Sequence, residues 1–164
     1  MQEYVSDAVV CDVETNGDLD TRVTFFTKHF GKFAAKAKSA RKITSKLAPH
    51  LQPGNLIRAR FVEKGGLQVV DALKRKRLDV PPHTLAALQA LFGEWQPEHE
   101  LWELVTQKPF SWSAALRILG WDPDHAACGL CGSNETPFFK PAGQEFFCAA
   151  CASQMKMSEL LYIS

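Results

Sequence analysis

Residues 56–73, with the sequence LIRARFVEKGGLQVVDAL, decide the fold of the N-terminal half. Apolar and basic side chains alternate over 56–62, which is the period of a β-strand with one face in a core and the other in solvent. Gly65 and Gly66 follow, and glycine adopts the positive φ values of a tight turn at little cost. A second strand over 67–73 completes the pattern. The sequence therefore predicts a hairpin that carries Arg58 and Arg60 on its polar side.

Three further strands are predicted before this hairpin. Side chains alternate over 5–13, and strands are predicted over 22–27 and 32–38, with Asn16-Gly17 as the turn of a first hairpin. A long connection, rich in proline, separates the third strand from the fourth. Five short strands with a break after the third are typical of a five-stranded Greek-key barrel, the oligonucleotide-binding (OB) fold. We therefore expect an OB-fold barrel over residues 1–80.

The hydrophobic period changes from about 2 to about 3.6 after Pro81-Pro82. A helical stripe over 85–92 ends at Gly93, and Pro97 lies where a second helix can begin. Ser111 is placed to cap a third helix, with Gly120 at its C-terminal end. We expect a short helical region over 81–121 and a separate module over 122–164. The fold class is therefore α+β.

Four of the five cysteines form two Cys-x2-Cys pairs, Cys128 with Cys131 and Cys148 with Cys151, separated by 16 residues. Two such pairs place four thiolates around one point, and zinc prefers this closed, soft, tetrahedral site; iron in a rubredoxin-like site is the main alternative. Four sulfur ligands leave no position for water, so we expect one structural Zn²⁺ in a zinc ribbon rather than a catalytic metal. Cys11 lies far away in sequence and is interpreted as a small core residue.

The net charge of +1 hides an uneven distribution. Residues 1–80 hold 15 Lys and Arg against 9 Asp and Glu, whereas residues 81–164 hold 4 against 9. No acidic residue occurs from 21 to 62, a pattern that favours a polyanionic partner. The ten basic residues of this stretch are the predicted DNA-binding residues: Arg22, Lys28, Lys32, Lys36, Lys38, Arg41, Lys42, Lys46, Arg58 and Arg60.

Aromatic residues are interleaved with these basic ones. Phe25 and Phe26 occupy opposite faces of one predicted strand, so one ring is expected in the core and the other outside. The outward ring, together with Phe30 in the following turn, could stack on nucleobases. Lysines suit phosphates without fixing a base, so we expect sequence-tolerant binding to the nucleic-acid backbone.

Several function classes are not supported by the sequence. The longest apolar run, 146–152, is too short to span a membrane, and the N-terminal residues lack the pattern of a signal peptide. Phosphate-binding loops, dinucleotide fingerprints, nucleophile elbows and paired metal-binding histidines are absent, so no catalytic residue is predicted. Three alternatives to DNA binding remain: a protein-interaction adaptor, an RNA-binding accessory protein, and an enzyme with a scattered site.

Both ends of the chain resemble the RecO family of bacterial recombination mediators. The matching segments are Thr27-x3-Gly31, then Ala37-Lys38-Ser39-Ala40-Arg41-Lys42 with Ser39 in place of the usual glycine, Leu119-Gly120, and the two cysteine pairs. The resemblance implies binding of single- and double-stranded DNA, annealing of complementary strands, and assistance in RecA loading. It also implies RecR and single-stranded-DNA-binding protein as partners, and a cytoplasmic, nucleoid-associated location.

Individual residues carry over from this resemblance. The basic residues of the matching segment, Lys36, Lys38, Arg41 and Lys42, correspond to DNA-binding candidates, and the four cysteines correspond to zinc ligands. The helical region is shorter than family members generally have.

Overall fold

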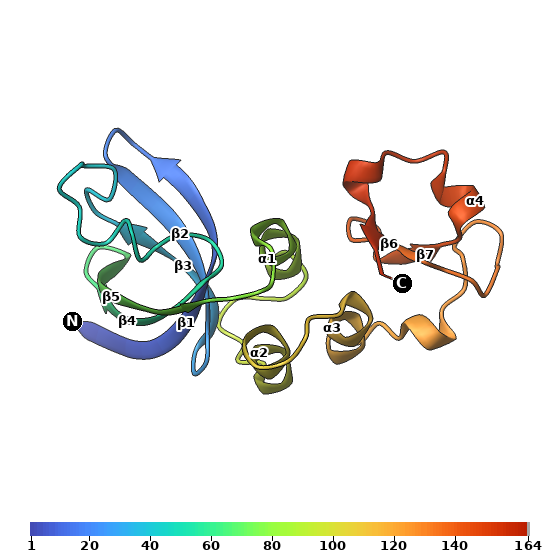
Figure 1. Ribbon diagram of the computed structural model, residues 1–164, viewed down its shortest axis with the longest axis horizontal. Coiled ribbons are helices and arrows are strands. Elements are labelled where there is room, and N and C mark those ends of the chain that lie inside the picture. The colour runs from blue at the N-terminus through green and yellow to red at the C-terminus, as the bar shows by residue number, and fades with distance from the viewer. Residues whose placement is uncertain (164) are drawn as a thin grey trace. The chain divides into compact units, whose positions relative to one another are not determined.

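The computed structural model describes residues 1–163 and divides the chain into two compact units, Met1–Lys108 and a second one from Pro109 onward. Figure 1 shows the barrel with helices α1 and α2 in the first unit, and helix α3 with the small sheet in the second. The division into three segments, 1–80, 81–121 and 122–164, stays a prediction. Two of the three helices of the middle segment belong to the barrel unit.

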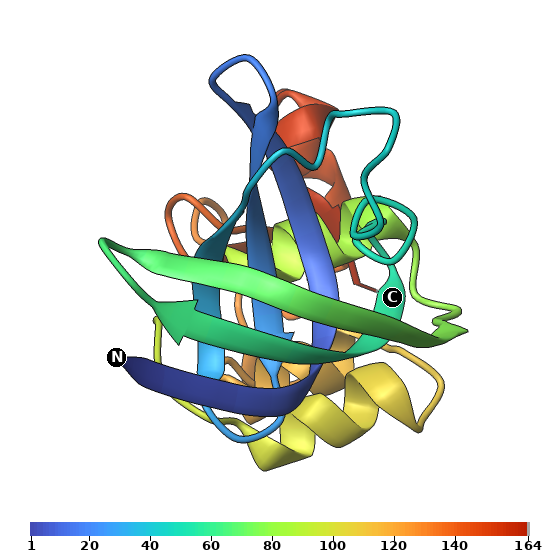
Figure 2. The same ribbon diagram turned by 90° about the vertical axis from the view of Figure 1, so that its left-hand side faces the viewer.

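The first unit is a closed barrel with the strand order β1-β2-β3-β5-β4, which confirms the predicted OB fold (Figure 2). Its strands are β1 (Gln2–Asn16), β2 (Asp20–Thr27), β3 (Gly31–Ala37), β4 (Asn55–Glu63) and β5 (Leu67–Arg77). The fifth strand is longer than the sequence pattern predicted. It extends to Arg77, so the basic run 74–77 lies on the strand rather than after it.

Aromatic rings fill the interior of the barrel. Phe61 makes edge-to-face contacts with both Phe25 and Phe33, at centroid distances of 5.0 and 4.8 Å. All three rings are buried, and small residues such as Ala8 and Ala59 make room for them. Such edge-to-face pairs add about 0.5–1.5 kcal/mol each beyond the burial of their area.

Helices α1 (Pro82–Gln89) and α2 (His99–Thr106) belong to the barrel unit, and side chains from α2 and from the loop after α1 cover part of the outer surface of the sheet. The ring of Phe26 contacts Phe92 at 5.1 Å and Trp102 at 5.5 Å, and its exposed fraction is 1%. The expectation of an outward ring on this strand is therefore wrong: Phe25 lies in the barrel, and Phe26 lies beneath the helical layer. Cys11 is buried as predicted, and burial raises the pKa of its thiol to about 12.

The second unit contains α3 and a three-stranded sheet with the order β7-β6-β8. Its elements are α3 (Trp112–Ile118), η1 (Pro123–His125), β6 (Phe138–Lys140), β7 (Glu145–Phe147), α4 (Ala149–Ala152), η2 (Met157–Glu159) and β8 (Leu161–Tyr162). The Ser111 hydroxyl accepts a hydrogen bond from the Ala114 N–H, which confirms the predicted N-cap. Gly120 has a φ of +104°, as a C-terminal glycine requires. Among the described residues, no helix is long and apolar enough to cross a membrane.

Candidate nucleic-acid interface and metal centre

The four cysteines of the second unit converge on one point. The ligand atoms of Cys128, Cys131, Cys148 and Cys151 all lie within 4.8 Å of one another, and the sulfurs of Cys131 and Cys148 are 3.6 Å apart. The first pair lies in a tight loop in which Gly132, with a φ of +77°, donates its N–H to the Cys128 carbonyl. In the second pair, the Cys148 sulfur accepts the N–H of Cys151 at 3.4 Å at the start of α4. This donor set fits a tetrahedral cation of soft character.

The protonation of these thiols supports the same interpretation. Backbone N–H groups of Cys148 and Cys131 lower the pKa of Cys128 to about 6, whereas hydrogen bonding to the Cys148 thiol raises the pKa of Cys151 to about 12. Sulfurs this close cannot all carry negative charge at neutral pH without a cation between them. A divalent metal supplies that charge and deprotonates its ligands on binding. The cluster can therefore hold a metal ion, and its four sulfurs suit a structural role.

The ten predicted DNA-binding residues do not form one surface. Arg22 lies near the start of β2 and Lys28 directly follows its end, six residues later, which corresponds to about 20 Å along an extended strand. Nine of the ten divide between two groups at these ends, and Lys32 belongs to neither. The ten basic residues therefore do not share a single side of the barrel.

The first group, called the loop group, surrounds the start of the long connection after β3. Its members are Arg22, Lys36, Lys38, Arg41, Lys42 and Lys46. The Lys36 ammonium lies 3.0 Å from the Asp20 carboxylate, which also accepts the Ser39 N–H at 2.7 Å. The Arg41 guanidinium donates to the Gly17 carbonyl at 3.0 Å. Some of the basic side chains in this group therefore hold the loop in place.

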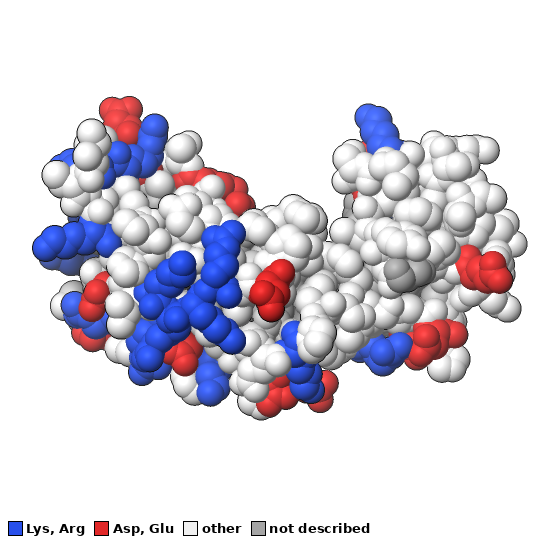
Figure 3. Space-filling model, in the orientation of Figure 1, with Lys and Arg blue, Asp and Glu red and all other residues white. Residues whose placement is uncertain are grey.

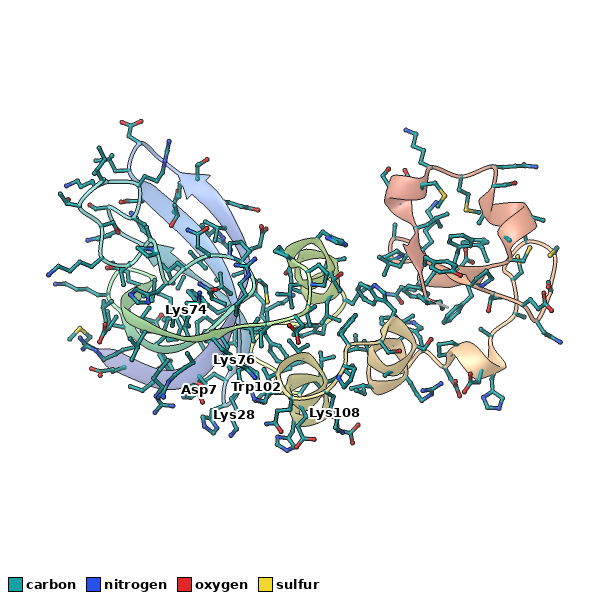
Figure 4. The ribbon with its side chains drawn as sticks, viewed as in Figure 1. Asp7, Lys28, Lys74, Lys76, Trp102 and Lys108 are labelled. Atoms are coloured by element: carbon teal, nitrogen blue, oxygen red, sulfur yellow. The ribbon has the colours of Figure 1, made fainter. Side chains whose placement is uncertain are left out.

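The second group consists of residues on β4 and β5 together with Lys28 of the β2–β3 turn, and we call it the β4–β5 basic face. Its members are exposed: Lys28, Arg58, Arg60, Lys74 and Lys76. Strand pairing sets Leu56 opposite Lys76 and Arg58 opposite Leu73, so Lys74 and Lys76 come near Arg58. Arg60 lies opposite the acidic Asp71. Figure 3 shows Lys and Arg gathered over these strands, and Figure 4 shows Lys28, Lys74 and Lys76 on the same side of the barrel.

Two acidic side chains pair with this face but leave it accessible. Arg58 lies 3.3 Å from Asp7, and Arg60 lies 3.7 Å from Glu3. Both pairs are exposed, and exposed ion pairs contribute only about 0–1 kcal/mol, so phosphates can compete for these arginines. The Lys76 ammonium donates to the Thr106 carbonyl at the end of α2 at 3.2 Å.

The run of four basic residues at the end of β5, 74–77, was not among the predicted site residues. The sequence placed 74–77 after the last strand, because the alternation of apolar residues ends at Leu73. The β4–β5 register, with irregularities beside Ile57 and Phe61, decides which of these residues come near Arg58. The sequence feature that could have indicated this part of the site is the run of four basic residues, 74–77.

Lys32 was predicted to bind DNA, but its side chain is buried and does not face solvent. Its ammonium donates to the Gln89 carbonyl at the end of α1 and lies 5.1 Å from the centre of the Phe92 ring. Desolvation by burial lowers the pKa of this lysine. The residue fixes the helical layer to the barrel instead of facing a phosphate.

Known proteins match this chain over most of its length. Residues 1–77 match the family described as "Recombination protein O N terminal". The DNA repair protein RecO of Myxococcus xanthus is 28% identical, over 96% of this chain and 76% of the relative. The proteins of the same name from Thermodesulfovibrio yellowstonii and Syntrophobacter fumaroxidans are each 26% identical, over 94% and 82% of this chain and 72% and 64% of their own lengths.

The alignment with the Myxococcus protein runs over 186 positions, more than the 164 residues of this chain, so parts of that relative have no counterpart here. The barrel agrees with the matched N-terminal family, and the similarity continues through the cysteine module. The N-terminal part of the chain is thus similar to the N-terminal domain of recombination protein O, and most of the chain is similar to DNA repair proteins named RecO.

Proposed function

We propose that this protein binds DNA through the β4–β5 basic face and promotes annealing of complementary strands during recombinational repair. The observation that carries the proposal is the pairing of β4 with β5. It sets Lys76 opposite Leu56 and Lys74 opposite Ile57, so that both lysines come near Arg58, from which the sequence separates them by a turn. The DNA repair proteins that match the chain support a polyanionic partner of this kind.

The physical basis of annealing is the reduction of repulsion between two phosphate backbones. Exposed lysines act as point charges that neutralise phosphates without selecting a base, so the strands stay free to pair. Five neutralised phosphates on a single strand correspond to a logarithmic salt slope of about −3.5. Binding should then weaken about a hundredfold when salt rises from 50 to 200 mM. No catalytic residue and no nucleotide hydrolysis are needed for this function.

The cysteine module has a supporting part in the proposal. We assign one structural Zn²⁺ to its four cysteines, because zinc favours closed four-sulfur sites. Family resemblance extends the function to RecA loading on strands coated by single-stranded-DNA-binding protein, with RecR as a partner, in the cytoplasm at the nucleoid. Those contacts are tested separately from DNA binding, by adding each partner to the annealing reaction.

The test compares two triple variants that each remove three positive charges. Lys28→Gln, Arg58→Gln and Lys74→Gln alter the β4–β5 basic face, whereas Lys38→Gln, Lys42→Gln and Lys46→Gln alter the loop group. Fluorescence anisotropy with a labelled single strand gives the salt slope, and annealing of coated complementary strands gives the rate. We expect the first triple to reduce the slope by about 2 and to slow annealing, because each lost phosphate contact on a single strand changes the slope by about 0.7.

The loop-group triple is the matched control, because it removes the same number of positive charges from a different part of the barrel unit. Equal effects of both triples would contradict the assignment to the β4–β5 basic face. A slope near zero for the natural protein would reject DNA binding by charge altogether. Zinc content and the thermal unfolding midpoint should be the same for both variants, since neither alters the core or the cysteines.

A further inference from the structure

Trp95, in the loop after α1, combines exposure with a backbone conformation that non-glycine residues rarely adopt. Its φ is +58°, and 45% of its side chain is exposed. The Trp95 N–H donates to the Lys32 carbonyl at 2.8 Å. The backbone of Gln96 packs so closely on Gly31 that a Cβ there would come within 2.5 Å of it. A left-handed tryptophan costs about 1–3 kcal/mol, and these contacts hold it in place.

The indole continues the aromatic core of the barrel toward solvent. It stacks on the buried Phe33 ring, with a centroid distance of 4.6 Å and an interplanar angle of 21°. Tyr4 lies 5.6 Å from the indole and makes an edge-to-face contact with Phe30 at 5.1 Å. Because Phe33, Tyr4 and the strained backbone fix its position, the exposed part of the indole is rigid before any ligand arrives.

The surroundings of this aromatic cluster match those of a nucleic-acid strand. Lys28 precedes Phe30 by two residues in the β2–β3 turn, and Arg60 pairs in register with Val5, the neighbour of Tyr4. The cluster therefore borders Lys28, whereas Arg60 points to the opposite face of the sheet from Tyr4. Glu94, next to Trp95, repels phosphates, so a bound backbone is expected to follow the basic face while a base reaches the indole.

We propose that Trp95, supported by Tyr4 and Phe30, is a stacking platform for a nucleobase of single-stranded DNA. This inference rests on the proposed DNA binding. It adds to the binding free energy a contribution that does not depend on charge. Stacking of a base on an aromatic ring contributes about 1–3 kcal/mol and tolerates any sequence. Bases of a duplex are already stacked on each other, so the platform favours single strands.

The test uses an oligothymidylate and an abasic oligonucleotide of the same length, which carries the same phosphates without bases. Trp95→Gly removes the ring, and glycine accepts the left-handed backbone. We expect Trp95→Gly to weaken oligothymidylate binding by about 5- to 150-fold, the equivalent of one stacked base. The salt slope and the affinity for the abasic strand should stay unchanged.

Two further variants keep the result decisive. Trp95→Phe retains a ring and should recover most of the affinity, but the quenching of Trp95 fluorescence by oligothymidylate should disappear. Tyr162→Leu, at an exposed aromatic residue of the second unit, is the matched control and should leave binding unchanged. If Trp95→Gly alters folding, the comparison of quenching between the natural protein and Trp95→Phe decides the question.

Equal losses for oligothymidylate and the abasic strand would overturn the platform, as would unchanged quenching in Trp95→Phe. Failure of the proposed function has a different signature, because it removes the salt slope of the natural protein. A normal slope without any effect of Trp95 would leave DNA binding in place and reject only the platform.

Discussion

The two units of this protein are stabilised in different ways. The barrel closes five strands of 7 to 15 residues around buried phenylalanines, so it can bury enough apolar area to be stable. The cysteine module has strands of only two or three residues and a smaller cluster around Phe147 and Leu160. Segments this small usually need a metal or cross-links. Removal of the metal should therefore unfold the second unit, whereas truncation of buried side chains in the barrel should destabilise the first unit.

The charges of the two units differ as well. Residues 1–108 hold 16 Lys and Arg against 13 Asp and Glu, whereas residues 109–164 hold 3 against 5. The net excess of basic residues is therefore confined to the first unit. The residues proposed to bind DNA accordingly all belong to the barrel unit.

Removal of the metal is expected to have the largest effect. Chelation, or Cys148→Ala, should unfold the small sheet and α4, because metal binding to such sites is worth about 10–16 kcal/mol and is coupled to folding. Amide NMR of the full chain should show collapse of the signals from the second unit while the barrel signals persist. Metal analysis should give one zinc per natural chain and none in the variant.

Cys11→Ala is the control for this prediction, because Cys11 belongs to the barrel unit and is not one of the four clustered cysteines. It should retain the metal in full. Simultaneous collapse of the barrel signals on chelation would contradict the independence of the two units.

Truncation of the barrel core tests the comparison in the opposite direction. Phe61→Ala removes a ring that contacts Phe25 and Phe33, and such changes cost about 3–5 kcal/mol. Urea unfolding followed by far-ultraviolet circular dichroism should show an earlier barrel transition. The metal content of the variant should stay at one per chain, and loss of zinc would show that the units are coupled.

Alanine substitutions at two glycines test whether the Trp95 loop packs on Gly31. Gly17 and Gly31 have φ values of +75° and +76°, so alanine is strained at both by about 1–2 kcal/mol. Only at Gly31 would the new Cβ meet the backbone of Gln96, and overpacking adds about 1–3 kcal/mol there. We expect Gly31→Ala to lower the free energy of unfolding more than Gly17→Ala and to change Trp95 fluorescence. Equal costs would mean that the loop does not rest on Gly31.

The smallest expected effect concerns pH. The Ser39 N–H, followed by Lys36, holds the pKa of Asp20 below its ordinary value. A lowered pKa stabilises the folded state above the ordinary carboxyl pKa of about 3.9, and this gain disappears as pH falls through the lower folded value. Natural protein should therefore unfold at a higher temperature than Asp20→Asn at pH 6, with the difference shrinking toward pH 2. A difference independent of pH would show that charge is not its cause.

Local patterns in the sequence determined the parts of the fold that depend on neighbours along the chain. Alternation over 56–62 predicted β4, Ser111 predicted the start of α3, and the spacing of the cysteine pairs predicted the cluster, which the structure confirms. These features are predictable because strand period, helix capping and Cys-x2-Cys loops involve residues only a few positions apart.

Only the tertiary structure decided which outer faces of the barrel are covered. The period of β2 put Phe26 outside the barrel, but Trp102 and Phe92, more than 60 residues later, bury it. Lys32 is a basic residue of the type that contacts DNA, but its ammonium instead donates a hydrogen bond to the Gln89 carbonyl of α1. The register of β4 with β5 likewise set Lys74 and Lys76 opposite Ile57 and Leu56, which precede Arg58 on β4. A local pattern assigns a side chain to a face, whereas contacts between distant segments decide whether that face meets solvent.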